Sequence, residues 1–208
     1  MKAANDKPLP ESPSQTAGPY LHIGCLPNFS GIDGIYPEDP GCCMVNANTR
    51  GERIKIQGQV YDGDGAPLLD AMLEIWQADA AGLYPSARDT RAEADADTEF
   101  GGWGRQPCDP ETGEFAFDTI KPGQVPYPDG RAQAPHITVW IVARGINIGL
   151  HTRLYFDDES DANALDPILA GLAEGGRGQT LIAKSDGEGG YRFDIYLQGD
   201  HETGFFDM

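Results

Sequence analysis

Two positions in the stretch APHITVW, residues 134–140, have the spacing of a metal-binding pair. Side chains two residues apart lie on the same face of a β-strand, so a histidine at 136 and another at 138 would present two imidazoles to one iron ion. The second position holds Thr138, which is a poor ligand at neutral pH. On their own, these residues favour an ordinary core histidine at His136 over a metal ligand.

Two tyrosines and an arginine follow predicted strands. Tyr84 comes just after a glycine turn, and Tyr127 lies in the proline- and glycine-rich loop 119–130. A phenolate binds ferric iron, although a tyrosine at an interface or in a core is the commoner case. Arg144 follows a long apolar strand, and its guanidinium suits a carboxylate ligand. An ordinary ion pair with an acidic side chain is the alternative for Arg144.

The charge balance excludes several classes of partner. Fifteen basic and 33 acidic residues give a net charge of −18, so the chain has no basic stripe for nucleic acid or an anionic membrane. An anionic small molecule would need a local cation. The N-terminus has no apolar segment of signal-peptide length and the four cysteines have no CxxC spacing, so we expect a cytoplasmic protein with reduced thiols.

Alternating apolar and polar residues predict the elements that must position these side chains. One helical candidate, 161–175, is limited to short pieces by Pro167. The predicted strands and hairpin are 54–60, 71–75, 113–120, 136–145, 152–158 and 180–199. This pattern predicts an all-β protein, with a β-sandwich core, an extended N-terminal arm, long loops and little helix.

The chain divides at about residue 50 by composition. Residues 1–50 are rich in proline, glycine and serine, and 8–20 are typical of an extended arm. We expect 51–208 to form the sandwich domain and 1–50 to form an arm and loop that are either mobile or laid across a surface, such as that of a partner.

Several of these segments together resemble one known family. The stretches GQVYDGDGAPLLDAMLEIWQADAAGLY, TIKPG, APHITV and TRLYFDDE resemble the intradiol ring-cleavage dioxygenases in order and spacing. The arm PSQTAGPYLHIG, the segment VARGINIGLHTRLYF and the terminal ETGFFDM are more narrowly similar to the alpha chain of the two-chain members. The resemblance implies a β-sandwich enzyme with ferric iron held by two tyrosines and two histidines.

Compared position by position with the iron-carrying chain, half of the ligand set is missing. Tyr84 matches the first tyrosine and His136 the first histidine. Val125 stands in place of the second tyrosine and Thr138 in place of the second histidine, while Gln133 replaces an arginine. Valine has no donor atom, so we predict that this chain binds no metal and holds no catalytic residue by itself.

The resemblance implies that Fe(III) is bound by a homologous beta subunit, within a large alternating hetero-oligomer. Protocatechuate and O2 would be the substrates, and the ring would open between the two hydroxylated carbons to give 3-carboxy-cis,cis-muconate. In such a complex this chain would contribute to the substrate pocket through Thr16, Gly18, Pro19, Tyr20 and Arg144.

Two other hypotheses explain part of the pattern. In the first, the chain is a self-sufficient ferric dioxygenase in which Tyr127 replaces the tyrosine lost at Val125. In the second, it is a non-catalytic transthyretin-like binding module, since such modules share the DGDG strand–turn–strand. The second hypothesis leaves the arm and the ARGINI segment unexplained.

Overall fold

A computed structural model describes residues 16–18, 20–91, 96–147 and 149–207. Within these ranges, nine strands form one sheet in the order β11-β1-β10-β9-β8-β7-β2-β3, with β4 paired to β1, and β5 and β6 form a separate hairpin. The strands are β1 (Arg53–Tyr61), β2 (Met72–Trp76), β3 (Trp103–Pro107), β4 (Glu114–Ile120), β5 (Val125–Pro126), β6 (Ala132–Gln133), β7 (His136–Val142), β8 (Leu150–Phe156), β9 (Ile182–Ser185), β10 (Gly190–Arg192) and β11 (Ile195–Tyr196).

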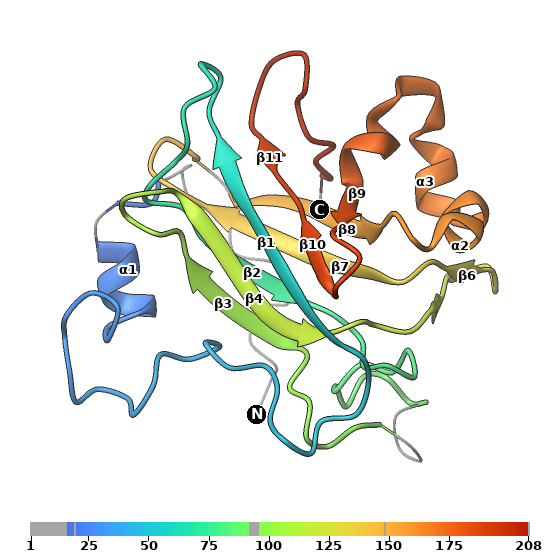
Figure 1. The fold of residues 1–208 in the computed structure, drawn as a ribbon, viewed down its shortest axis with the longest axis horizontal. Coiled ribbons are helices and arrows are strands. Elements are labelled where there is room, and N and C mark those ends of the chain that lie inside the picture. The colour runs from blue at the N-terminus through green and yellow to red at the C-terminus, as the bar shows by residue number, and fades with distance from the viewer. Residues whose placement is uncertain (1–15, 19, 92–95, 148, 208) are drawn as a thin grey trace, which may run out of the picture.

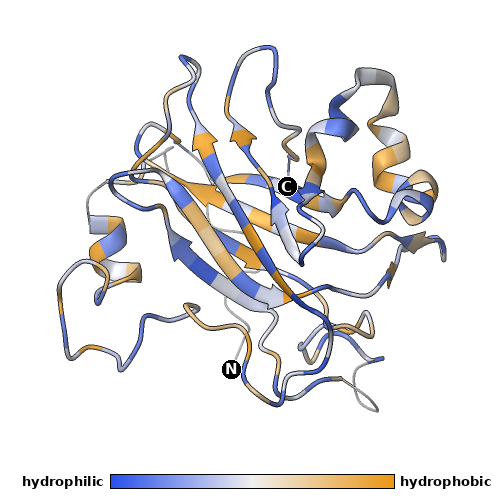
Figure 2. Ribbon diagram, viewed as in Figure 1, coloured by the Kyte–Doolittle hydropathy of each residue, from blue (hydrophilic) through white to orange (hydrophobic). Residues whose placement is uncertain are grey.

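The sheet folds over so that two layers face each other (Figure 1). One layer contains β4, β1, β10 and β11, and the other contains β3, β2, β7 and β8. Alternate residues of β1 are buried, and Phe115 and Phe117 of β4 share a core with Ile75 of β2 and Val139 of β7. Apolar and polar residues alternate along these strands in Figure 2. The predicted β-sandwich is therefore confirmed.

The predicted C-terminal hairpin is present, but its second strand is interrupted. Strand β9 pairs antiparallel with β10, as expected across the turn at 186–190. Both β10 and β11 then run parallel to β1, and the break between them lies at Phe193. A Cβ atom at Gly58 of β1 would overlap the Phe193 carbonyl oxygen, so glycine permits this close approach.

The helices are short and lie outside the two layers (Figure 1). Pro167 begins a new helix, as its position predicted, and the buried Asp166 before it caps the helix by accepting from the backbone N–H of Ile168 and Leu169. The helices are α1 (Tyr20–Cys25), α2 (Ser160–Leu165), α3 (Pro167–Gly171) and the 3₁₀ turns η1 (Ala173–Gly175) and η2 (Arg177–Leu181). In the part of the chain that the structure describes, no helix is long and apolar enough to cross a membrane.

Two elements differ from the sequence prediction. Strand β3 had no alternation to indicate it, and it forms because its backbone pairs with β2 along its whole length. Residues 20–25, which lie in the N-terminal region where no helix was predicted, form α1, and this helix is held by tertiary packing. Leu26, just after α1, packs with Met72 and Val142 on the outer face of β2 and β7. The described part of 16–50 therefore lies against the sandwich.

Candidate functional site

The outer face of β7 carries two of the positions that the family resemblance matched to metal ligands, His136 and Thr138. Across from His136 lies Tyr155 of β8, and across from Thr138 lie Arg153 of β8 and Trp76 of β2. Directly paired residues share a face of a sheet, so these side chains project to the same side. Loop residue Tyr84 joins them by stacking on Trp76, with ring centroids 5.8 Å apart and planes 10° apart.

His136 keeps the orientation of a metal-binding histidine. Its side chain is buried, and Nδ1 lies 2.8 Å from the Ala134 carbonyl oxygen, which can only accept, so Nδ1 carries the proton. Ligating histidines in proteins are commonly held by such a bond. Burial, together with the positive charge of Arg153, lowers the pKa of His136 to about 4. The imidazole is therefore neutral at physiological pH.

A buried carboxylate fixes the backbone that supports this histidine. Asp166 Oδ2 accepts a 2.8 Å hydrogen bond from the Ala134 N–H, while Oδ1 accepts from Ile168 and Leu169 in α3. One side chain thus joins the start of α3 to the residues just before β7.

Arg153 brings a positive charge into this group of side chains. Its Nη1 donates to Gln133 Oε1 at 2.8 Å and to the Tyr155 hydroxyl at 3.3 Å. Burial raises the pKa of Tyr84, and the charge of Arg153 acts in the opposite direction. The Arg153 guanidinium therefore lies among the positions that the resemblance matched to iron ligands. A hydrogen bond to Gln133, which stands where the resemblance places an arginine, holds it there.

The hairpin β5–β6 carries Val125, the other position that the resemblance matched to an iron ligand but that has no donor atom. Val125 is buried and pairs with Gln133, whose Nε2 also donates to the Pro126 carbonyl. Tyr127 lies at the tip of this hairpin, where its N–H bonds to the Arg131 carbonyl and its ring lies 5.8 Å beneath the Arg131 guanidinium. Tyr127 is thus part of the hairpin turn, and the Arg131 guanidinium covers its ring.

The residues present do not fit a ferric ion. Of the four aligned positions, only Tyr84 and His136 carry a suitable donor atom, since Val125 has none and the Thr138 hydroxyl is a poor ligand. Arg153 adds a fixed positive charge beside them, which opposes the binding of a trivalent cation. The residues at this site therefore support no chemical step through a bound metal.

The predicted substrate-binding residues lie at the opposite end of β7. Thr16 Oγ1 accepts a 2.7 Å hydrogen bond from the Gly145 N–H, so the arm lies directly beside the turn that carries Arg144. Arg144 is exposed and forms an ion pair with Asp70 at 3.3 Å. Gly18 and Tyr20 are exposed beside Thr16, with Tyr20 81% accessible. The fifth predicted residue, Pro19, lies outside the described residues.

Sequence reasoning missed Arg153 and Asp166. Arg153 and Tyr155 are two residues apart in a predicted strand, so their shared face was foreseeable, but their place opposite His136 and Thr138 depends on which strand lies next to β7. Asp166 precedes a proline, which is a common start of a helix, and this could have indicated its capping role.

Comparisons with known proteins place these features in context. Residues 34–199 match the family model described as Dioxygenase. The chain is 46% identical over 203 residues to the protocatechuate 3,4-dioxygenase alpha chain of Pseudomonas putida, covering 96% of this chain and 98% of that one. It is 36% identical to the protocatechuate 3,4-dioxygenase beta chain of Burkholderia cepacia, over 77% of this chain and 70% of that one.

A solved structure gives a similar result. The dioxygenase domain of a dioxygenase carbohydrate-binding protein fusion from Streptomyces sp. SirexAA-E superposes with a TM-score of 0.50 at 26% identity. The match covers 83% of this chain and 96% of that one.

Proposed function

This chain belongs to the intradiol dioxygenase family, and we propose that it acts as the alpha-type, iron-free chain of a protocatechuate 3,4-dioxygenase. The complex would convert protocatechuate and O2 to 3-carboxy-cis,cis-muconate. Fe(III) and its ligands would belong to a homologous beta subunit, and the two chains would alternate in a large hetero-oligomer. The free state of all four cysteines supports a reducing, cytoplasmic setting for the complex.

The observation that carries the proposal is the state of the site on β7. The chain keeps the scaffold of an iron site, with His136 oriented by Ala134 and Tyr84 stacked nearby, yet it holds Val125 and Arg153 where a cation would need donors. A chain that retains the family fold without the ligand set fits a supporting subunit better than an independent enzyme. Family membership likewise argues against an unrelated transthyretin-like module.

We propose that the arm and the turn after β7 form this chain's share of the substrate pocket. Thr16 is hydrogen-bonded to Gly145, so Gly18 and Tyr20 follow in the chain from a point next to Arg144. The ion pair between Arg144 and Asp70 is exposed, and exposed pairs contribute little stability. Arg144 can therefore exchange Asp70 for the substrate carboxylate at small cost, in a chain whose net charge otherwise repels that anion.

A direct test of the subunit assignment is iron analysis of each chain. The chain should co-purify with the iron-bearing homologue when the two are expressed together, and the complex should be coloured by its phenolate–ferric site. Expressed alone, this chain should be colourless, contain no stoichiometric iron and fail to open catechol rings. A coloured, active preparation of this chain alone would overturn the proposal.

The substrate role of Arg144 is tested by Arg144→Ala in the reconstituted complex. Loss of a carboxylate contact should lower kcat/KM for protocatechuate by about 10- to 100-fold, because charge-assisted hydrogen bonds contribute about 1.5–3 kcal/mol. Catechol lacks the carboxylate, so its turnover should change little. Arg131→Ala, which removes an exposed arginine at another hairpin, is the matched control. Equal losses for protocatechuate and catechol would contradict a carboxylate contact.

A further inference from the structure

A second group of side chains with metal-ligand atoms lies in the loop between α1 and β1, distant in sequence from β7. Cys42 Sγ and Cys43 Sγ are 3.5 Å apart, and each lies 3.6 Å from Glu38 Oε2. The ligand atoms of Glu38, Cys42 and Cys43 all lie within 4.8 Å of one another. Among the described residues, no other three histidine, cysteine or acidic side chains meet this distance. All three side chains are at least partly accessible, so an ion can reach them.

The three distances match a tetrahedral zinc site. Zinc binds thiolate sulfur at about 2.3 Å and carboxylate oxygen at about 2.0 Å, so ideal tetrahedral angles separate two sulfurs by about 3.8 Å and a sulfur from an oxygen by about 3.5 Å. The observed separations differ from these values by only a few tenths of an ångström. Small side-chain rotations would therefore be enough to bind the ion.

The backbone beneath these ligands is held by contacts that do not involve them. The Arg105 N–H of β3 donates to the Gly41 carbonyl, and Gln106 Nε2 donates to the Cys42 carbonyl, both at 2.9 Å. Gly41 has φ +83°, and a Cβ there would press on the backbone of Arg105, so this close approach requires glycine. The backbone at Gly41 and Cys42 is thus anchored to the edge strand β3 before any metal binds.

The other end of the ligand group is fixed as well. Asp39, next to Glu38, accepts hydrogen bonds from the backbone N–H of Asn28 and Phe29, each at 2.8 Å. Because both ends of the segment are anchored, little backbone entropy remains to be lost on binding a cation.

We propose that Glu38, Cys42 and Cys43 form a site for a thiophilic divalent cation of the zinc class, with water in the fourth position. Two thiolates select zinc-like ions over Mg²⁺ and Ca²⁺, which prefer oxygen ligands.

The test is a zinc titration of the reduced, metal-free full-length chain against a chromophoric chelator, repeated with Co²⁺ to detect thiolate charge-transfer absorption. Wild type should bind one equivalent. Cys43→Ser should weaken zinc binding by more than about 100-fold, which exceeds the loss expected when a residue that only contacts a ligand is changed. Glu38→Gln should weaken zinc binding by about 10-fold. The thermal midpoint of wild type should rise with zinc, and that of Cys43→Ser should not.

Two control variants make the same types of substitution at positions outside the proposed site. Cys25→Ser removes a thiol elsewhere, and Asp33→Asn removes an exposed carboxylate from the same loop. Both should bind like wild type, and far-UV circular dichroism should show all variants folded. Absence of a stoichiometric wild-type site, or equal affinity in wild type, Cys43→Ser and Glu38→Gln, would overturn the proposal.

Discussion

At the scale of single residues, the site on β7 places a positive charge beside the positions that the family resemblance matches to iron ligands. Arg153 lies opposite Thr138 and donates hydrogen bonds to Gln133 and Tyr155, so these three side chains form a hydrogen-bonded group around the guanidinium. The charge is fixed to the chain and, unlike a metal ion, has no open coordination position for a substrate.

Restoring the missing donors should therefore not be sufficient to restore iron binding. Val125→Tyr with Thr138→His recreates the family's donor types, but Arg153 still opposes a trivalent cation. Adding Arg153→Gln should increase iron affinity at least about 10-fold, since removing a nearby like charge favours the cation. The phenolate–ferric absorption and the iron content of the two variants measure this difference, with Arg153→Gln alone as control. Equal iron binding by the double and triple variants would contradict the role given to Arg153.

His136 should make the stability of the chain sensitive to acid. Its pKa is lowered from 6.5 to about 4 in the folded state, so between these values the unfolded chain binds a proton that the folded chain does not. Stability should therefore fall as the pH drops from 6.5 through 4, by about 3 kcal/mol in total. Urea unfolding of wild type and His136→Asn across this range measures the effect, and the variant should show a shallower dependence. Parallel curves for the two proteins would contradict it.

At the scale of elements, the register between β7 and β8 determines what the site contains. His136 pairs with Tyr155, and a shift by one residue would turn Arg153 and Tyr155 toward the opposite face. This register is reinforced by Asp166, which joins the start of α3 to Ala134. The short helices thus stabilise the end of the strand that carries His136.

Removing that connection should destabilise the fold measurably. Asp166→Ala would leave the N–H groups of Ala134, Ile168 and Leu169 without their acceptor, at a cost of about 3 kcal/mol from the lost helix cap and the buried donors. Asp166→Asn keeps one oxygen and should lose less. Asp161→Asn, an exposed acid in the first turn of α2, is the control and should change stability by less than about 0.5 kcal/mol. Denaturant midpoints that do not separate Asp166→Ala from Asp161→Asn would refute this account.

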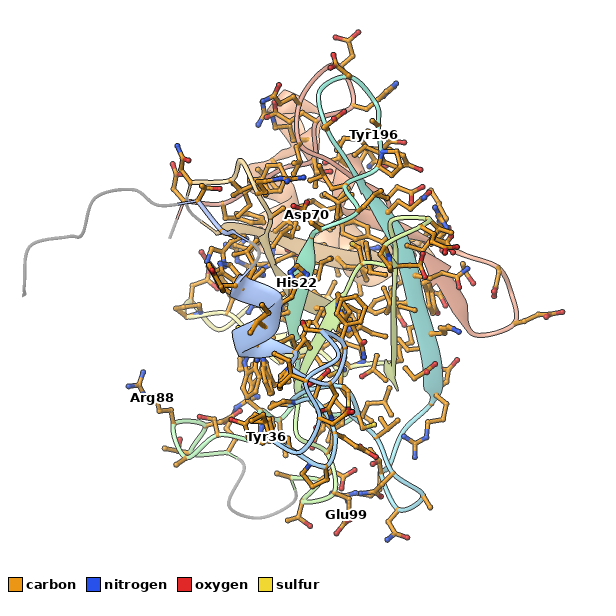
Figure 3. The ribbon with its side chains drawn as sticks, turned by 90° about the vertical axis from the view of Figure 1, so that its left-hand side faces the viewer. His22, Tyr36, Asp70, Arg88, Glu99 and Tyr196 are labelled. Carbon is orange, nitrogen blue, oxygen red and sulfur yellow. The ribbon has the colours of Figure 1, made fainter. Side chains whose placement is uncertain are left out.

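At the scale of the whole molecule, an apolar surface indicates where a partner binds. The described part of 20–36 carries large hydrophobic side chains that are 38–81% accessible: Tyr20, Ile23, Phe29, Ile32, Ile35 and Tyr36. We call this set the arm patch. Helix α1 and the loop that bears Tyr36 lie on the side that faces the viewer in Figure 3. Monomeric proteins rarely expose so many neighbouring apolar groups, so we expect the partner chain to cover this patch.

Charging the arm patch should weaken assembly without unfolding the chain. Ile32→Asp with Ile35→Asp places two charges on exposed positions, which should reduce affinity for the iron-bearing chain at least about 10-fold, because a buried unpaired charge is costly. Leu165→Asp, which charges an exposed leucine on α2 at the other end of the molecule, is the control (Figure 1). Co-purification and sedimentation measure the result. An intact complex in the double variant would show that the partner binds elsewhere.

Local patterns in the sequence determined the fold class, and the family resemblance predicted an incomplete set of iron ligands. The alternation of β1 and β4 predicted the buried faces because side chains in a strand alternate with a period of two. The absence of a donor at Val125 is a property of the residue itself, so the aligned sequence was enough to predict an incomplete ligand set.

Contacts between distant segments decided the rest. The pairing of β7 with β8 placed Arg153 opposite Thr138, packing on β2 and β7 holds the segment that contains α1, and a hydrogen bond from β3 anchors the backbone at Cys42. None of these contacts has a periodic signal, because each depends on which segments become neighbours once the sandwich closes over its core.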